Sequence, residues 1–390
     1  MGIKERRIYL VAIRKRYWAA GKTVKATILD EFCAVCGYHR KHAIRLLAKG
    51  DRKPRRRPGR PARYQPEALV PILKRLWLAT DQMCSKKLVA ALPLWLPFYE
   101  RSYGRLEDDR KEQLLAISSA TLDRLLTPVR AAIPGRGRCG TKPGTLLRTQ
   151  IPIRTSNWDI TRPGFVEADT VAHCGNSLAG DFIWSLTLTD IHSGWTECRA
   201  MWNNGATGVI AQIKDIETHL AFPLEAVDCD NGSEFLNHHL VRYFSEHKPR
   251  KVRLTRSRPY RKNDNAHVEQ KNYSHVRHLL GYDRLEDPAL VSPINHLYTH
   301  AFSAYQNHFC PTLKLKHKER RGSRYHKSYY PPQTPYQRLL ASPDLSPDQR
   351  DQLIRYHESL DPFQLKKQIE RELKAIFRLV SVTRNVRQRL

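Results

Sequence analysis

Three acidic residues in the second half of the chain have the types and surroundings expected of a divalent-cation site. Asp169 ends a short predicted strand, and Asp230 ends another directly before an Asn-Gly turn. In open α/β sheets, ligands bind in the crevice outside the carboxyl ends of the strands. Because carboxylate oxygens are the ligands that Mg²⁺ prefers, two strand-end acids and a third from elsewhere would make a magnesium site.

The third acid is Glu269, which lies in a segment with helical periodicity. A carboxylate on an apolar stripe is costly to bury unless it is paired or bound to a cation. Lys271 and Arg277 lie on the other faces of the same predicted helix. The stripe expected to face the sheet contains Ala266, Glu269, Tyr273, Val276 and Leu280.

Other acids compete for these roles. Glu167 precedes Asp169 by two residues and Asp228 precedes Asp230 by two, so each pair shares one face of its strand. Either member of each pair could be the ligand. Asp190 and Asp264 are further candidates, and a strand-end acid is often a plain turn residue.

The elements that would position these acids form a mixed α/β pattern. Three predicted strands are followed by helices and strands in alternation, which favours a layered α/β fold. The strands are expected at residues 165–171, 182–190, 195–202, 224–230 and 251–255, and the helices at residues 206–220, 234–246 and from 265 onward.

The composition points to a polyanionic partner. The 390 residues include 67 Lys and Arg against 38 Asp and Glu, a formal net charge of +29. Each Lys or Arg placed on a phosphate releases condensed counterions, so nucleic acid is the expected partner. No apolar run approaches the roughly 20 residues that cross a bilayer, and the eight scattered cysteines lack the density of a disulfide framework. We expect a cytosolic protein that does not bind membranes.

Residues 1–50 are predicted to form a helix-turn-helix module that binds DNA. A helix over residues 25–34, a turn at Gly37 and a second helix over residues 38–47 fit this pattern. Arg40, Lys41 and Arg45 would lie on the recognition helix. The alternative is an ordinary helical hairpin with a solvated basic face.

Cys33, Cys36, His39 and His42 have the residue types of a zinc site. Only two residues separate the Cys pair from the His pair, whereas zinc fingers place roughly a dozen residues there. We therefore expect core thiols and DNA-facing imidazoles in preference to zinc.

Basic linkers are predicted on both sides of a second helical DNA-binding module at residues 66–132. The first, residues 51–65, contains seven basic residues in the twelve positions 52–63, and its Arg57 and Arg60 are typical of a minor-groove arm. The second linker, residues 133–158, is rich in Gly, Pro and Arg.

Two further basic tracts are expected to follow DNA phosphates. Residues 248–262 contain eight Lys or Arg and run into the helix of Glu269, and a second tract spans residues 314–327. We expect a basic carboxy-terminal region at 301–390 with a helical tail. The DNA contacts predicted around the helix of Glu269 are Arg256, Arg258, Arg261, Lys262, Lys271 and Arg277.

These motifs together resemble the catalytic core of the retroviral-integrase superfamily, especially its bacterial insertion-sequence transposases. The resemblance rests on Asp169, on the sequence DNGSEF at 230–235 and on the segment of residues 258–269 that ends at Glu269. Sixty residues separate the first two acids and 38 separate the second from the third. Tyr273 stands where these enzymes often carry a lysine, and Lys271 or Arg277 is expected to substitute.

The resemblance implies an RNase H-like catalytic core at residues 159–300 with Asp169, Asp230 and Glu269 as a DDE triad. It implies an enzyme that uses Mg²⁺ or Mn²⁺, as two ions, to cleave DNA at element ends and to join the freed 3′-hydroxyl to target DNA. It also implies a homo-oligomer on double-stranded DNA, in the bacterial cytoplasm and associated with the nucleoid. The alternatives are a catalytically inactive DNA-binding regulator and a nuclease that hydrolyses without joining.

Overall fold

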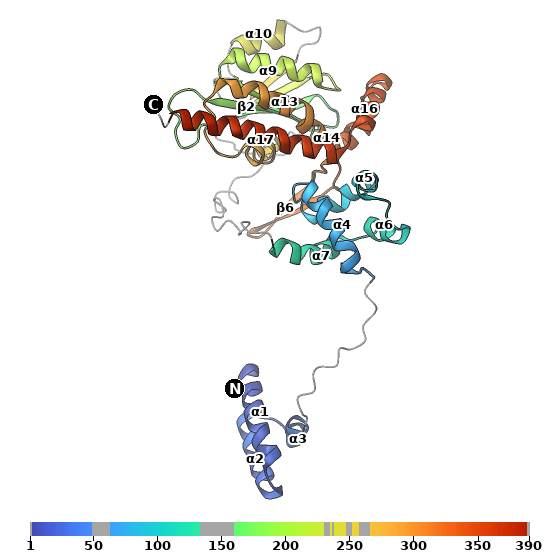
Figure 1. The fold of residues 1–390 in the computed structure, drawn as a ribbon, viewed down its shortest axis with the longest axis vertical. Coiled ribbons are helices and arrows are strands. Elements are labelled where there is room, and N and C mark those ends of the chain that lie inside the picture. Colours follow the sequence, from blue (N-terminus) through green and yellow to red (C-terminus); the bar gives the residue numbers. More distant parts are fainter. Residues whose placement is uncertain are drawn as a thin grey trace. The chain divides into compact units, whose positions relative to one another are not determined.

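The computed structural model describes residues 2–48, 63–132, 160–229, 235, 238–246, 252–256 and 266–387 (Figure 1). The chain divides into two compact units, Met1–Arg63 and Tyr64–Leu390. In the described residues, no helix is long and apolar enough to cross a membrane.

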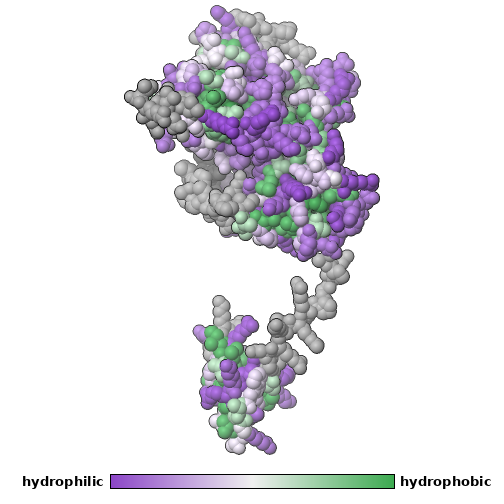
Figure 2. Space-filling model, in the orientation of Figure 1, coloured by the Kyte–Doolittle hydropathy of each residue, from purple (hydrophilic) through white to green (hydrophobic). Residues whose placement is uncertain are grey.

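The smaller unit is a three-helix cluster with a core of its own. Helices α1 (Ile3–Ala19), α2 (Lys22–Cys36) and α3 (Arg40–Ala48) bury Ile13, Phe32 and Leu47 between them. Gly37 ends α2 in the left-handed conformation, with φ 67°, which favours glycine. The predicted order of helix, turn and helix is therefore present. Figure 2 also shows apolar patches on this unit, and Ile8 and Val11 of α1 are exposed.

The larger unit begins with four helices. Ser118 caps the amino-terminal end of the fourth helix, α7 (Ser119–Ala131). The Ser118 hydroxyl accepts the backbone N–H of Thr121 at 3.2 Å. The helices are α4 (Pro66–Ala79), α5 (Ser85–Tyr103), α6 (Asp108–Leu115) and α7 (Ser119–Ala131).

A five-stranded mixed sheet follows in the order β3-β2-β1-β4-β5. Strands β1, β2 and β3 are antiparallel neighbours, whereas β4 pairs parallel with both β1 and β5. This order and these directions confirm the mixed α/β fold expected from the sequence. The strands are β1 (Phe165–Ala172), β2 (Ile183–Asp190), β3 (Thr196–Trp202), β4 (Ala226–Cys229) and β5 (Arg253–Arg256), with helices α9 (Ala206–His219) and α10 (His238–Glu246) between them.

The rest of the chain is mainly helical, with one β-hairpin. Two segments, η1 (Asn272–Arg277) and η3 (Tyr298–Phe302), are π-helical, and η2 (Pro288–Leu290) is a 3₁₀ turn. The helices are α11 (Ala266–Lys271), α12 (His278–Leu280), α13 (Val291–Leu297), α14 (Ser303–Phe309), α15 (Pro335–Leu340), α16 (Pro347–Ser359) and α17 (Pro362–Arg387), and the hairpin is β6 (Leu315–Arg321) with β7 (Arg324–Tyr329).

Helices cover both faces of the sheet. Val166 and Ala168 of β1 point to the face packed by α9 and α10, and the alternating Val171 points to the face packed by α12–α14 and α17. Figure 1 shows α9 and α10 apart from α13 and α17, with β2 between them. Glu167 and Asp169 share the second face, because side chains alternate along a strand.

The four helices of residues 66–131 share a core with the carboxy-terminal helices. Trp95 of α5 is fully buried, and its indole N–H donates to the carbonyl of Phe309 at 3.0 Å. Its ring also packs edge-on against Phe363 of α17, at 5.1 Å between centroids. In this structure the predicted module at residues 66–132 thus packs into the same compact unit as the five-stranded sheet. Its role in DNA binding remains a prediction.

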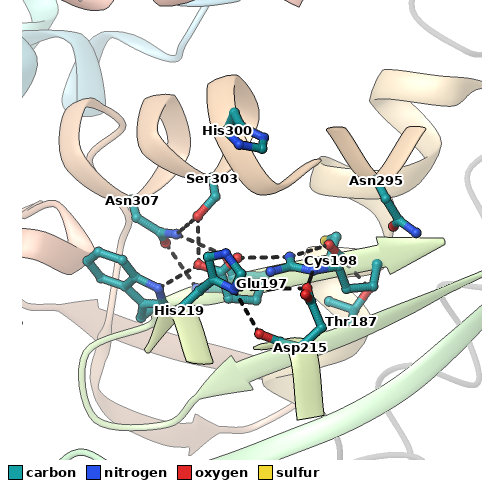
Figure 3. A network of polar contacts seen from close by, with 12 residues as sticks. Thr187, Glu197, Cys198, Asp215, His219, Asn295, His300, Ser303 and Asn307 are labelled. Carbon is teal, nitrogen blue, oxygen red and sulfur yellow. Dashed lines mark hydrogen bonds and ion pairs between the residues drawn. The ribbon is translucent and has the colours of Figure 1, made fainter. Parts of the chain in front are cut away.

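Two asparagines cover the outer edge of the sheet along β3 (Figure 3). Asn307 accepts the N–H of Thr196 at 2.9 Å and donates to its carbonyl at 3.0 Å. Asn295 makes the same pair of bonds with Ala200, at 2.6 and 2.9 Å. Because an uncovered edge invites pairing with another chain, these side chains replace a sixth strand.

Two buried histidines make the stability of the fold depend on pH. Burial lowers the pKa of His173 and of His308 to about 3, from 6.5, helped by Arg277 and by His357 respectively. The unfolded chain therefore binds protons below pH 6.5 that the folded chain does not, and stability falls as pH falls. At pH 5 the loss should reach about 2 kcal/mol per histidine.

Urea denaturation at pH 7.5 and pH 5 measures this loss. The double variant His173→Gln/His308→Gln should show a smaller decrease between the two pH values than the unchanged protein. An equal decrease in both would contradict the assignment to these histidines.

Candidate active site

Asp169 lies where the parallel pairing of β1 with β4 ends. The register places Glu167 opposite Asp228 and Ala168 opposite Cys229. The residue that follows Cys229 in the chain is Asp230, which lies outside the described residues. Asp169 therefore follows Ala168, and Asp230 follows Cys229. Ala168 and Cys229 are the last described pair between β1 and β4.

The prediction that Asp169 ends its strand is wrong. Strand β1 continues to Ala172, because its antiparallel pairing with β2 runs on to the pair Ala172 and Trp184. The pairing of β1 with β4 ends next to Asp169, but the strand itself continues. Asp169 is half-buried within β1.

The helix of Glu269 is joined to Asp169 by a neighbouring amide. Asn272 donates from Nδ2 to Asp169 Oδ2 at 2.6 Å. Asn272 follows Glu269 by three residues, so both lie on one side of the helix. The other carboxylate oxygen of Asp169 accepts the N–H of Thr170 at 2.8 Å. Two of the three predicted acids thus belong to elements in direct contact, and nothing in the periodicity singled out Asn272.

The predicted inward stripe of this helix is partly wrong. Val276 and Leu280 are buried as expected, but Glu269 and Tyr273 are exposed and Lys271 is buried. The reason is the π-helical segment η1, which starts at Asn272. A π turn contains more residues than an α turn, so residues before and after Asn272 do not follow one period of 3.6 residues. Glu269 therefore lies at the exposed side of α11.

Glu167 holds the start of this helix against the sheet. Its side chain is fully buried, and its Oε2 accepts the N–H of Val268 at 2.9 Å. This bond satisfies a backbone donor in the first turn of α11, next to Glu269. We therefore interpret Glu167 as a positioning residue for the helix.

Replacing Glu167 tests that role. Glu167→Gln retains a carbonyl oxygen that can accept the Val268 N–H, whereas Glu167→Ala removes it. We expect the alanine variant to lower DNA cleavage about 10-fold or more, since displaced catalytic groups are costly, and the glutamine variant to retain most activity. Rates of strand cleavage for both variants provide the measurement, and equal loss in both would contradict a purely positioning role.

The other candidate acids have local partners. Asp228 accepts the hydroxyl of Thr255 at 2.8 Å. Asp190 is fully buried and accepts the N–H of Gly164 and both the N–H and hydroxyl of Ser193. Burial raises the pKa of Asp190 to about 6, although the bonds from Ser193 and Gly164 oppose this. Asp190 therefore stabilises the turn after β2, and Asp264 lies outside the described residues.

The predicted DNA contacts lie in different environments. Arg40, Lys41 and Arg45 are exposed on α3, and Arg40 forms an ion pair with Asp30. Arg277 donates to the carbonyl of Ala172 at 2.9 Å and so ties η1 to β1. Arg256 ends β5, while Arg57, Arg60, Arg258, Arg261 and Lys262 lie outside the described residues.

Lys271 has an unusual environment for a predicted DNA contact. Its side chain is 8% exposed, and its ammonium donates to the carbonyl of Gly194 at 3.3 Å. Burial lowers its pKa to about 7, and the nearby charges of Lys87 and Arg338 add to this effect.

The four residues considered for zinc are divided between core and surface. Cys36 is buried, Cys33 packs against the same core, and His39 and His42 are exposed. His42 packs edge-on against Tyr38. Across the described parts of the chain, no three His, Cys, Asp or Glu side chains gather into a site that could hold a metal ion.

The chain is similar to a curated bacterial protein. The uncharacterized protein y4rM of Sinorhizobium fredii is 41% identical over 330 residues, which span 84% of this chain and 93% of that protein. The chain belongs to the y4rM family. No protein-family model matches it.

The y4rM-family chain is also similar to retroviral integrase structures. The catalytic core domain of BIV integrase aligns with 30% of this chain and 68% of its own, at 16% identity and a TM-score of 0.24. A simian T-cell lymphotropic virus intasome in complex with the PP2A subunit B56 gamma aligns with 64% of this chain and 76% of its own, at 17% identity and a TM-score of 0.35. The HTLV-2 integrase core in complex with magnesium gives 15% identity, a TM-score of 0.24 and coverage of 30% and 68%.

Proposed function

We propose that this protein is a DDE-type transposase, a polynucleotidyl transferase that cleaves DNA at the ends of an insertion element and joins the freed 3′-hydroxyl to target DNA. The observation that carries the proposal is the contact between Asp169 and Asn272, which brings β1 against the helix of Glu269. The register of β1 and β4 supports Asp230 as the third acid, because its chain neighbour Cys229 pairs with Ala168.

The donor set fits a hard divalent cation. Asp169, Asp230 and Glu269 would hold Mg²⁺ or Mn²⁺ through carboxylate oxygens, which are the ligands that these ions prefer. A bound pair of such ions activates the attacking oxygen and stabilises the leaving 3′ oxygen. The chain's own task is to orient the carboxylates, and Glu167 and Asn272 do this from the strand and from the helix.

Several features support DNA as the partner. The net charge of +29 favours a polyanion, and α3 presents Arg40, Lys41 and Arg45 on its exposed side. We propose that residues 1–50 recognise the element ends and that residues 66–132 add contacts. The linkers 51–65 and 133–158, with Arg57 and Arg60, would follow the phosphates.

Function on two element ends requires more than one protomer. One active site of this kind handles one strand at a time, so we propose a homo-oligomer on DNA. The charge surplus repels copies of the free chain, and DNA would neutralise that repulsion. We propose the bacterial cytoplasm, at the nucleoid, as its location.

The test is a strand-transfer reaction with the purified full chain. Labelled duplexes that carry the genomic sequences flanking its gene are incubated with Mg²⁺ and a target plasmid. Nicked and joined products differ in length, so joined products would support a transposase and nicked products alone would favour a nuclease. Binding without either product, with Mg²⁺ or Mn²⁺, would favour the catalytically inactive regulator.

A further inference from the structure

The larger unit contains a cavity of about 750 Å³ beside the helix of Glu269. Its walls come from the turn before α5, from α11 and η1, from the end of α14 and from the base of the β6–β7 hairpin. Among its described lining residues, Asp81 is the single carboxylate, and it forms an ion pair with Lys366. The cationic lining residues are Lys87, Lys271, Lys314, Lys327, Arg338 and Lys366.

Three of these cations are held in place by one turn of the backbone. Lys314, Arg338 and Lys271 donate to the successive carbonyls of His192, Ser193 and Gly194, at 2.9, 3.1 and 3.3 Å. Carbonyl oxygens satisfy hydrogen bonds but carry no net charge. The turn therefore fixes the positions of three basic side chains at the cavity, and Lys87 on α5 adds a fourth.

The hairpin extends this positive surface. Lys318 and Lys327 lie directly opposite each other in the antiparallel register, and the next pair on the same face is Arg320 with Tyr325. The ammonium of Lys318 lies 4.4 Å from the centre of the Tyr325 ring. Like charges directly opposite each other destabilise a strand pair. We call the face that contains Lys318, Lys327, Arg320 and Tyr325 the hairpin face. Repulsion between Lys318 and Lys327 destabilises it, and a bound polyanion would remove that repulsion.

The cavity and the hairpin face are continuous. Lys327 and Tyr329 of β7 both line the cavity, and the seven residues of β6 extend roughly 20 Å from it. A single small anion needs only the cavity, whereas this length matches several successive phosphates of one strand. Lys271 enters the cavity two residues after Glu269, on nearly the opposite side of the helix. Gln270 and Tyr273 of the same helix also line the cavity, so the cationic surface adjoins the segment that carries Glu269.

We propose that this cavity and the adjoining hairpin face form a second DNA-binding site, which holds the phosphates of one DNA strand beside the helix of Glu269. The inference rests on the proposed function for the identity of the polyanion. Within the basic tract at residues 314–327, the hairpin face is thus the part that would contact DNA.

Two matched double variants of the full chain test the hairpin face. Lys318→Gln/Lys327→Gln removes the opposed pair on the proposed face, and Arg321→Gln/Arg324→Gln removes an opposed, exposed pair on the other face. The probe is a fluorescein-labelled duplex, and affinity is measured by anisotropy from about 50 to 200 mM salt. Loss of two phosphate contacts should lower the salt slope by about 1.8, so that the affinity lost over this range is about 12-fold smaller than in the unchanged protein.

The control pair should leave the slope nearly unchanged, and the first pair should not lower the thermal midpoint. Equal slopes in both variants would overturn the hairpin assignment. For the cavity, Lys87→Gln should lower the slope by about 0.9. If Lys87→Gln instead leaves duplex binding intact but abolishes thermal stabilisation by sodium tripolyphosphate, the cavity binds small anions and the proposal fails.

These failures differ from failure of the proposed function. A chain that cleaves end DNA but binds duplex equally well in all variants would refute only the second site. A chain that shows the expected change in slope but no cleavage would refute only the transposase.

Discussion

Asp169→Asn and Glu269→Gln are each expected to reduce DNA strand cleavage by about 10³-fold or more while DNA affinity changes little. The amide keeps the shape of the carboxylate but removes the charge that a divalent cation requires. Loss of one such ligand should cost about 4 kcal/mol of transition-state stabilisation, which corresponds to a factor of about 10³ in rate. The same result is expected for Asp230→Asn.

Single-turnover cleavage of labelled end duplex gives the rate, and anisotropy gives the affinity. Asp228→Asn is the matched control, because Asp228 accepts a hydrogen bond from Thr255 and its amide can still do so. Cleavage at the unchanged rate in Asp169→Asn would show that Asp169 is not the ligand on β1. A greater loss in Asp228→Asn than in Asp230→Asn would show that Asp228 is the ligand in place of Asp230.

Arg199→Met should destabilise the larger unit by about 3–5 kcal/mol, because removal of one partner leaves a buried charge unpaired. Arg199 is 1% exposed, and it donates to Glu197 at 3.2 Å and to Asp215 at 2.5 Å. Glu197 is 3% exposed and also accepts the Trp195 indole N–H and the Ser303 hydroxyl, at 2.9 and 2.6 Å. Figure 3 shows Glu197 between Ser303 of α14 and Asp215 of α9.

The urea midpoint of the larger unit measures this loss. The double variant Arg199→Met/Glu197→Gln should recover part of it, since Gln is neutral and its oxygen can still accept from Trp195 or Ser303. If the double variant is as unstable as the sum of both single variants, the two side chains act independently and the charge argument fails.

Local patterns in the sequence predicted much of the sheet. Alternating and apolar runs located all five strands to within a few residues, because strand side chains repeat every two positions and the turns between them carry Gly, Asn and Asp. The prediction that Asp169 ends its strand was wrong, because β1 continues to Ala172. The partner of Asp169, Asn272, was missed, because nothing in the periodicity distinguishes it from its neighbours.

Features that depend on distant contacts were not predictable in the same way. The spacing argument for Glu269 assumed 3.6 residues per turn, and the π-helical segment from Asn272 breaks that period. The sequence predicted a helical module at residues 66–132, but not that Trp95 of this module packs against Phe309 and Phe363. A hydrophobic period identifies a buried face and leaves its partner unspecified.

The shared core around Trp95 has a consequence for synthesis on the ribosome. Its partners Phe309 and Phe363 emerge more than 200 residues after Trp95 itself, and chains grow at about 5–20 residues per second. Helices α4–α7 must therefore wait roughly ten seconds or more for α17 before their core can close. The three-helix unit of residues 2–48 contains its own core and needs no such delay. A nascent chain would thus have a folded amino-terminal unit before the larger unit is complete, and a prematurely ended chain would retain only the former.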